Sequence, residues 1–159
     1  VVDGGPCSIG IESTIVDMSS HVPKVLRLGG MALEQLERVL GPIATELSSS
    51  NPSAPGMLTS HYNPGIPVQL FEDREALLAA VKSNSNSNKI GILYWGERIT
   101  HASSFNLSEQ QSDSEAACNL FKGLRLLGKA PVTTIYVHLL PEYGLGRAVN
   151  DRLQRAASK

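Results

Sequence analysis

The 159-residue chain is 42% hydrophobic, which is enough to fill the core of one ordinary domain or of two small ones. Its net charge of −1 and its lack of a basic run argue against a nucleic-acid-binding surface. No apolar stretch approaches the roughly 20 residues that a membrane-spanning helix needs. The two cysteines, Cys7 and Cys118, are far apart in the sequence, which favours a reducing, cytoplasmic setting over a disulfide scaffold.

The first fifty residues predict two strands and one helix. β-branched residues dominate 9–17, and V-L-R-L occupies 25–28, so these segments predict an antiparallel pair joined by a short loop. Residues 32–40 place apolar side chains on one helical stripe. So few elements cannot bury a core alone, and the chain opens without a Met or a signal-peptide pattern. We therefore interpret this part as the end of a domain in a longer protein.

A proline-rich segment, P-S-A-P-G-M-L-T-S-H-Y-N-P, occupies residues 52–64. Its prolines and glycine exclude a helix or a central strand. Its Met, Leu, His and Tyr side chains are unusual for a flexible spacer, which would carry Gly, Ser and charged residues instead. We therefore expect this linker, residues 51–65, to lie against another part of the protein.

Residues 66–159 alternate between short apolar runs and longer stretches with helical spacing. The order is strand, helix, strand, strand, helix, strand and helix, which predicts an α/β fold with a Rossmann-like, open, parallel-rich sheet. The polar run S-N-S-N-S-N predicts a surface loop, and the third strand is expected at an edge of the sheet. The predicted strands are 68–71, 89–95, 103–107 and 132–139, and the predicted helices are 72–82, 112–127 and a last one from about 146.

Two polar residues of the N-terminal strands are candidates for ligand binding. Ser13 directs its hydroxyl to a ligand if its side of the strand lines a site, with Glu12 pointing the opposite way. On a half-exposed strand, the same residues simply face water. Arg27 offers a guanidinium that grips phosphate or carboxylate through two hydrogen bonds, or it faces solvent on an edge strand. The residue pattern leaves both alternatives open.

The linker supplies a third candidate, the pair His61 and Tyr62. Their rings could bind a nucleotide base or phosphate. Alternatively, they pack the linker onto one domain.

G-L-G-R at 144–147 lacks the third glycine of the dinucleotide-binding fingerprint and predicts a tight strand-to-helix turn. The four histidines show no metal-ligand spacing, and the sequence contains neither a nucleophile elbow nor a P-loop.

Four motifs, in this order, resemble one family. They are D-G-G-P-C-S-I-G-I-E-S-T-I-V-D, V-L-R-L-G-G, P-S-A-P-G-M-L-T-S-H-Y-N-P and G-L-G-R-A-V-N-D-R-L-Q-R-A-A. The family is the larger, two-domain form of L-threonylcarbamoyladenylate synthase, which joins a YrdC-type catalytic domain to an added C-terminal domain. The resemblance implies that residues 1–50 end a YrdC-like domain, that 51–65 link the two domains, and that 66–159 form the C-terminal domain.

The resemblance also implies a reaction, in which L-threonine, bicarbonate and ATP, expected with Mg²⁺, give threonylcarbamoyl-AMP and pyrophosphate. This product serves the machinery that places threonylcarbamoyl groups on adenosine in tRNA. By the same resemblance, Ser13 binds L-threonine, Arg27 binds the nucleotide, and Tyr62 with His61 closes over the nucleotide.

The family's N-terminal ATP-binding motifs have no counterpart in this sequence, so we expect the isolated chain to be inactive. The alternative is a non-catalytic regulatory module that binds a nucleotide or a partner.

Overall fold

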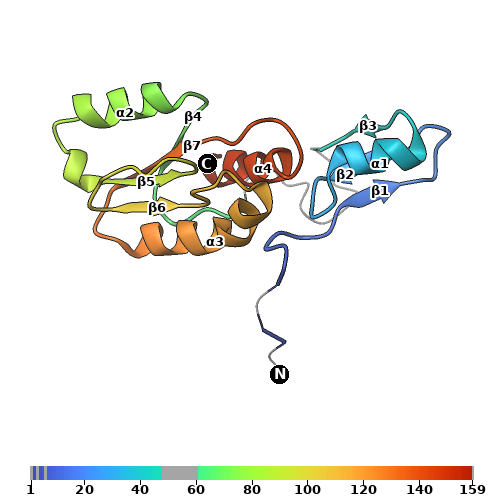
Figure 1. Cartoon of the computed structure of the whole chain (residues 1–159), viewed down its shortest axis with the longest axis horizontal. Helices are drawn as coiled ribbons and strands as arrows, with labels where there is room; N and C mark the ends of the chain where they lie inside the picture. The colour runs from blue at the N-terminus through green and yellow to red at the C-terminus, as the bar shows by residue number, and fades with distance from the viewer. Residues whose placement is uncertain (1, 3, 6, 48–60, 159) are drawn as a thin grey trace.

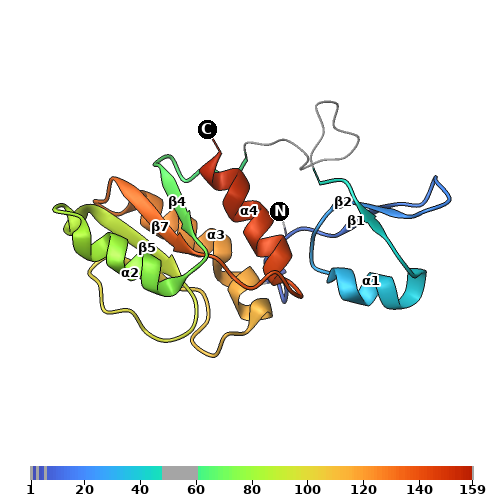
Figure 2. The same ribbon diagram turned by 90° about the horizontal axis from the view of Figure 1, so that it is seen from above.

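The computed structural model describes residues 2, 4–5, 7–47 and 61–158. We call residues 7–47 the N-terminal part and residues 61–158 the C-terminal part. Figure 1 shows the two parts side by side, and both Figure 1 and Figure 2 place the last helix between them. Predictions about 52–60 lie outside the described residues.

A small three-stranded sheet and one helix make up the N-terminal part. The strands β1 (Ile15–Asp17), β2 (Lys24–Arg27) and β3 (Ala44–Thr45) lie in the order β1-β2-β3, and α1 is Leu33–Leu40. β1 and β2 are antiparallel, with Val16 opposite Val25, as predicted. β3 pairs with β2 in parallel and was not predicted, because a two-residue strand has no periodicity to detect.

The predicted strand over 9–17 is wrong for its first six residues. Only Ile15–Asp17 pair with β2, and the register shifts between Ile15 and Val16. Upstream of this point, the chain is held by contacts of another kind. The Gly30 N–H donates to the Glu12 carbonyl at 2.9 Å, and the hydroxyl of Thr14 accepts from the Met31 N–H at 3.1 Å. The chain therefore enters the sheet only after the polar segment that includes Ser13.

The C-terminal part is built on a parallel four-stranded sheet. Its elements are β4 (Val68–Phe71), α2 (Arg74–Ser83), a 3₁₀ turn η1 (Ser87–Lys89), β5 (Ile90–Tyr94), β6 (Ser104–Asn106), α3 (Asp113–Lys129), β7 (Thr134–His138) and α4 (Gly146–Ala157). The strand order is β4-β7-β5-β6, and every described pair is parallel. The predicted Rossmann-like open sheet is confirmed, and so is the edge position of the third strand, β6.

Helices cover both faces of this sheet. Along β7, Ile135 and Val137 pack with residues of α3 and α4, whereas Tyr136 packs with α2 on the other face. This alternation follows from the two-residue period of a strand. β5 is buried along its whole length, which explains why the sequence there is continuously apolar.

The core of the C-terminal part continues into the N-terminal part. Ile11, Val25 and Leu28 belong to the same buried cluster as the α3 and α4 residues. Gly10 permits a close approach, since a Cβ there would lie 2.5 Å from the Cα of Cys118 in α3. The Cys118 thiol lies 3.0 Å from the carbonyl oxygen of Ser8. The N-terminal part is therefore packed directly onto α3 and α4.

Candidate functional site

The structure brings Ser13 and Arg27 together. The Arg27 Nε–H donates to the Ser13 carbonyl at 3.0 Å, and an Arg27 terminal nitrogen lies 3.1 Å from the Ser13 hydroxyl. Ser13 is exposed and Arg27, at the end of β2, is half-buried. A hydroxyl and a guanidinium thus lie side by side at the end of β2. This arrangement suits a small ligand that has a hydrogen-bonding group and a negative charge.

Gly29 allows this arrangement. A Cβ at this position would lie 2.3 Å from the Ser13 carbonyl carbon and 2.3 Å from the Thr14 nitrogen, distances that no real side chain tolerates. Only glycine therefore lets the end of β2 lie against the polar segment. The V-L-R-L-G-G motif consequently positions Arg27 and Ser13 through one backbone contact.

Glu12, the residue before Ser13, joins three separate segments of the chain. One carboxylate oxygen, Oε1, accepts from the Tyr62 hydroxyl at 2.5 Å. The other, Oε2, accepts from the Arg152 Nε–H at 3.2 Å and from a terminal nitrogen of Arg152 at 3.0 Å. We call these three residues the Glu12–Tyr62–Arg152 cluster. It connects the segment that carries Ser13 to the end of the linker and to α4.

Tyr62 lies in the left-handed backbone region, with φ of 62°. A non-glycine residue in this region costs of order 1–3 kcal/mol, so its surroundings must hold it there. The hydroxyl is bonded to Glu12, and the ring lies 5.1 Å from the Phe121 ring of α3. His61 packs edge-on against Tyr62, with 4.0 Å between ring centroids. Tyr62 is therefore a positioned side chain at the contact between the two parts.

α4 holds the chain on both sides of residues 48–60. The Arg155 guanidinium donates to the Leu47 carbonyl at 2.7 Å, while the Arg155 carbonyl accepts from the His61 N–H at 3.2 Å. Asp151 orients the Arg155 side chain through an ion pair of 2.8 Å. The last residue described before residues 48–60 and the first one described after them thus contact the same residue of α4.

The electrostatics of the cluster favour an ionised Glu12 and a protonated Tyr62. Burial alone would raise the pKa of Glu12, but hydrogen bonds from Tyr62, its own backbone and Arg152 outweigh it and lower that pKa. Burial, followed by the hydrogen bond to Glu12 and its charge, raises the pKa of Tyr62 from 10.0 to about 12. At neutral pH the tyrosine is therefore a hydrogen-bond donor to a carboxylate.

Sequence reasoning found Ser13, Arg27, His61 and Tyr62 but missed the residues that connect them. Glu12 was noted only as pointing away from the neighbouring hydroxyls, and Arg152 was not considered. A signal for Arg152 was present, because it is the arginine near the end of G-L-G-R-A-V-N-D-R-L. The glycines of that motif form the tight turn that was predicted, and Arg152 occupies the following helix.

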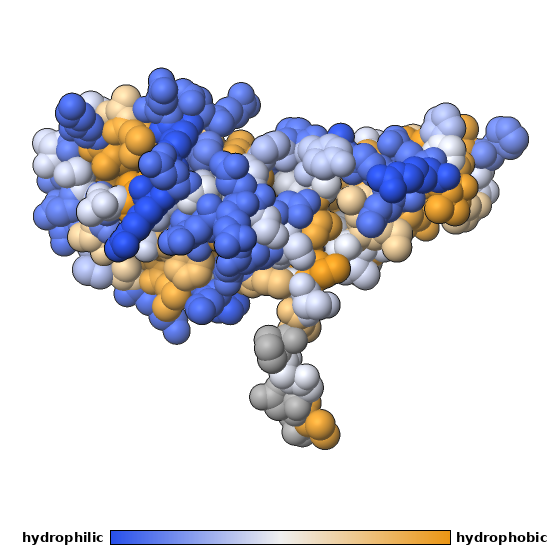
Figure 3. All heavy atoms as spheres, viewed as in Figure 1, coloured by the Kyte–Doolittle hydropathy of each residue, from blue (hydrophilic) through white to orange (hydrophobic). Residues whose placement is uncertain are grey.

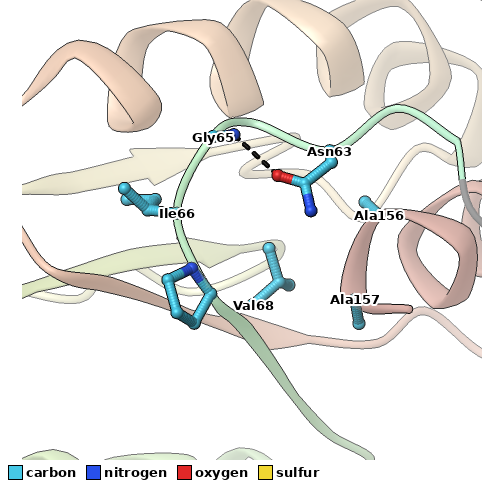
Figure 4. Close-up of a pocket in the computed structure, with 7 residues that line it drawn as sticks. Asn63, Gly65, Ile66, Val68, Ala156 and Ala157 are labelled. Atoms are coloured by element: carbon cyan, nitrogen blue, oxygen red, sulfur yellow. Dashed lines mark hydrogen bonds between the residues drawn. The ribbon is translucent and has the colours of Figure 1, made fainter. Parts of the chain in front are cut away.

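One cavity lies beside the C-terminal end of the linker. Asn63, Gly65, Ala156 and Ala157 are among the residues that line its volume of about 230 Å³ (Figure 4). The Asn63 side chain accepts from the Gly65 N–H at 2.7 Å, which closes a local turn. None of the residues lining this cavity carries a charged side chain, so it offers little to grip an anion.

A second cavity, of about 340 Å³, lies between α1 and the start of α4. Its lining includes Glu34, Arg38 and Asp113. One oxygen of Glu34 accepts from Arg147 at 2.6 Å, and the other is buried with no hydrogen-bond partner among the described residues. Neither cavity is lined by the four predicted site residues.

Within residues 7–47 and 61–158, no group of three His, Cys, Asp or Glu residues could hold a metal ion. The helices described there are also too short or too polar to cross a membrane.

Comparisons with known proteins agree with the sequence motifs. The model of a family described as "Threonylcarbamoyl-AMP synthase, C-terminal domain" matches residues 31–158. The chain is similar to the threonylcarbamoyl-AMP synthases of Bacillus subtilis, at 32% identity, and Pyrococcus abyssi, at 35% identity, over 99% of its length. Among solved structures, it is similar to P. abyssi Sua5 complexed with L-threonine, with a TM-score of 0.83, 33% identity and 98% of this chain covered.

The chain spans about half the length of these relatives, 48% of each of the two synthases and 48% of the Sua5 chain in the L-threonine complex.

Proposed function

Because the chain belongs to the family of threonylcarbamoyl-AMP synthase C-terminal domains, we propose that it is the C-terminal portion of such a synthase. The whole enzyme would convert L-threonine, bicarbonate and ATP to threonylcarbamoyl-AMP and pyrophosphate, as a nucleotidyltransferase. Its product would supply the machinery that transfers threonylcarbamoyl groups to tRNA. The observation that carries this proposal is the pairing of Ser13 with Arg27 in a chain that is similar to P. abyssi Sua5 complexed with L-threonine.

Ser13 is proposed to bind L-threonine. Its hydroxyl is exposed and lies 3.1 Å from a cationic nitrogen, so it is oriented before a ligand arrives. A serine hydroxyl both donates and accepts, and it therefore suits the polar end of an amino acid.

Arg27, Tyr62 and His61 are proposed to bind the nucleotide. A guanidinium beside a phosphate offsets the charge that develops there, and aromatic rings cover a base or sugar. In support of this assignment, Tyr62 and Arg27 both bond to the same polar segment: Tyr62 bonds to Glu12, and Arg27 bonds to Ser13.

The proposed chemistry needs positioning and charge stabilisation more than a nucleophilic side chain, because carbamate and ATP carry the reacting atoms. We assign no nucleophile or general base to this chain. Mg²⁺ is expected to arrive with ATP, and we assign it no residue here, since the described residues offer no cluster of ligands.

The proposed domain boundaries are 1–50 for the end of the YrdC-like domain, 51–65 for the linker and 66–159 for the C-terminal domain. The cytoplasm is proposed as the compartment, on the ground that both cysteines are free thiols.

Pyrophosphate release tests the proposal. The chain would be assayed with L-threonine, bicarbonate and ATP, alone and as part of the longer protein that carries it. We expect release from the longer protein and none from the isolated chain. No release from the longer protein, together with nucleotide binding by the chain alone, would favour the non-catalytic regulatory module instead.

A further inference from the structure

Arg152 of α4 is buried, and all three nitrogens of its guanidinium contact carboxylates. Its side chain is 1% exposed, and the guanidinium contacts Glu12 through two nitrogens and Asp151 through a third at 3.0 Å. Burying an unpaired guanidinium is costly, so two carboxylates beside it are what make this position tolerable. One of those carboxylates belongs to the C-terminal part and the other to the N-terminal part.

Glu12 connects Arg152 to two further residues, Tyr62 and Ser13. Its carboxylate uses one oxygen for Arg152 and the other for the hydroxyl of Tyr62, so the rotamer that satisfies Arg152 also fixes the acceptor of Tyr62. Through the backbone, Glu12 is bonded directly to Ser13. Arg152 itself touches neither Ser13 nor Tyr62 in any described contact.

We propose that Arg152 is a positioning residue for the substrate site, through which α4 holds Glu12 and thereby places both Tyr62 and the segment carrying Ser13. The role of that site in threonylcarbamoyl-AMP synthesis rests on the function proposed above. The mechanical part of the proposal, that Arg152 holds Tyr62 through Glu12, stands on the geometry alone.

The backbone of Tyr62 supports this assignment. A tyrosine at φ of 62° returns to an ordinary conformation unless its surroundings prevent it. The hydrogen bond to Glu12 is one restraint, and the packing on Phe121 is another. The first restraint exists only while Glu12 keeps its orientation, which Arg152 sets with two hydrogen bonds from its planar fork.

Arg147 provides a matched control. It also lies on α4 and also pairs with a glutamate of the N-terminal part, Glu34, at 2.6 Å. Glu34 lines the cavity between α1 and α4, and the pair has no described contact with the Glu12–Tyr62–Arg152 cluster. Removing Arg147 therefore weakens the contact between the two parts without touching the restraint on Tyr62.

Amide hydrogen exchange in the longer protein that carries this chain tests the mechanical part. We expect Arg152→Met and Glu12→Gln to speed exchange about tenfold at residues 61–65 and to leave exchange in β5 and β7 unchanged. The exchange rate of Arg152→Lys at residues 61–65 should lie between the rates of these variants and of wild type, because lysine keeps the positive charge but lacks the planar guanidinium that forms two hydrogen bonds. Arg147→Met should change exchange at 61–65 by less than about twofold.

Unchanged exchange at 61–65 in Glu12→Gln would overturn the proposal, and so would equal acceleration in Arg147→Met. Glu12→Gln carries the test if Arg152→Met does not fold, since Glu12 lies at the surface edge of the cluster, with a side chain 34% exposed. Tyr62→Phe completes the experiment. Combined with Arg152→Met, it should add little further acceleration although the two side chains share no described contact, whereas fully additive effects would contradict the proposal.

Pyrophosphate release then tests the functional part. Arg152→Lys is expected to raise the KM for L-threonine about tenfold and to change kcat by less than about threefold, because it misplaces a binding group without removing it. A wild-type protein that releases no pyrophosphate would refute the synthase function while leaving the exchange result intact. An active wild type whose KM is unaffected by Arg152→Lys would overturn the functional role of Arg152.

Discussion

The two parts of the chain differ in how much of their own apolar surface they bury. In the N-terminal part, the buried apolar residues are Ile11, Val25, Leu26 and Leu28, and α1 has no buried residue at all. In the C-terminal part, α3 alone buries six residues, and β5 is buried throughout. The C-terminal part thus has a core of its own, whereas the N-terminal part depends on α3 and α4 for much of its burial.

The exposed surface shows the same difference. Several large apolar side chains of the N-terminal part face solvent, among them Met18, Val22, Met31 and Val39, the last at 83% exposure. Figure 3 shows orange patches on the N-terminal part, at the end farthest from the C-terminal part. The Glu12–Tyr62–Arg152 cluster lies at the contact between the two parts, so the C-terminal part contributes hydrogen bonds to the segment that carries Ser13.

The largest expected effect on stability follows from truncating a side chain in the core that the two parts share. Leu153 of α4 is fully buried in the cluster that joins both parts. Leu153→Ala should destabilise the chain by about 2–5 kcal/mol, because it leaves a cavity in this shared cluster. Val39→Ala, at an exposed position of α1, should stay within about 0.5 kcal/mol. Denaturant unfolding of both variants makes the measurement, and equal effects would contradict the contrast between the two parts.

Gly29→Ala should affect mainly the N-terminal part. The added Cβ would lie 2.3 Å from backbone atoms of Ser13 and Thr14, so the end of β2 must move away. We expect a loss of about 1–3 kcal/mol, together with faster amide exchange in β1 and β2 and unchanged exchange in β5 and β7. Gly4→Ala is the control, because no atom of the described residues beyond its chain neighbours would lie within 4 Å of the new Cβ. Uniform acceleration across both sheets would show that the two parts do not open separately.

Alkaline pH should weaken the contact between the two parts. The pKa of Tyr62 is raised from 10.0 to about 12 when folded, so its stabilising effect is complete below pH 10 and is lost as the pH rises toward 12. The difference in Tm between wild type and Tyr62→Phe should therefore shrink between pH 10 and pH 12. A constant difference across this range would indicate that the hydroxyl does not bond to Glu12.

Acidic pH should also weaken the contact between the two parts, in this case by protonating Glu12. The folded-state pKa of Glu12 is lowered from 4.5, so its contribution is complete above about pH 4.5 and is lost as the pH falls through the folded value. The Tm of wild type should approach that of Glu12→Gln over that range. This effect should be the smallest of the four, because a carboxylate that is partly exposed is screened by solvent.

Much of the C-terminal fold could be predicted, because its elements are long and periodic. The predicted helix over 112–127 corresponds to Asp113–Lys129, and the strand predicted at 132–139 corresponds to Thr134–His138. The polar run 83–88 was predicted as a loop, and its end instead begins the 3₁₀ turn Ser87–Lys89, since serine and asparagine side chains favour such local turns.

The N-terminal part was predicted less well because distant contacts override its local pattern. Residues 9–14 have the composition of a strand, but Gly30 and Met31 hold them outside the sheet. Contacts between remote residues have no local signature at all. Glu12 and Arg152 stand 140 positions apart, and Cys7 and Cys118 are neighbours in space although they are 111 positions apart. Likewise, only the structure decides that Arg27 bonds to Ser13.

The most direct test of the account is the dependence of pyrophosphate release on L-threonine in the Ser13→Ala variant of the longer protein. Loss of the hydroxyl should raise the KM for L-threonine at least about tenfold and leave the KM for ATP near its wild-type value. Ser20→Ala, which alters an exposed hydroxyl bonded only to the Val22 carbonyl in the described contacts, should leave both values unchanged. A Ser13→Ala protein with a wild-type KM for L-threonine would contradict the proposed site.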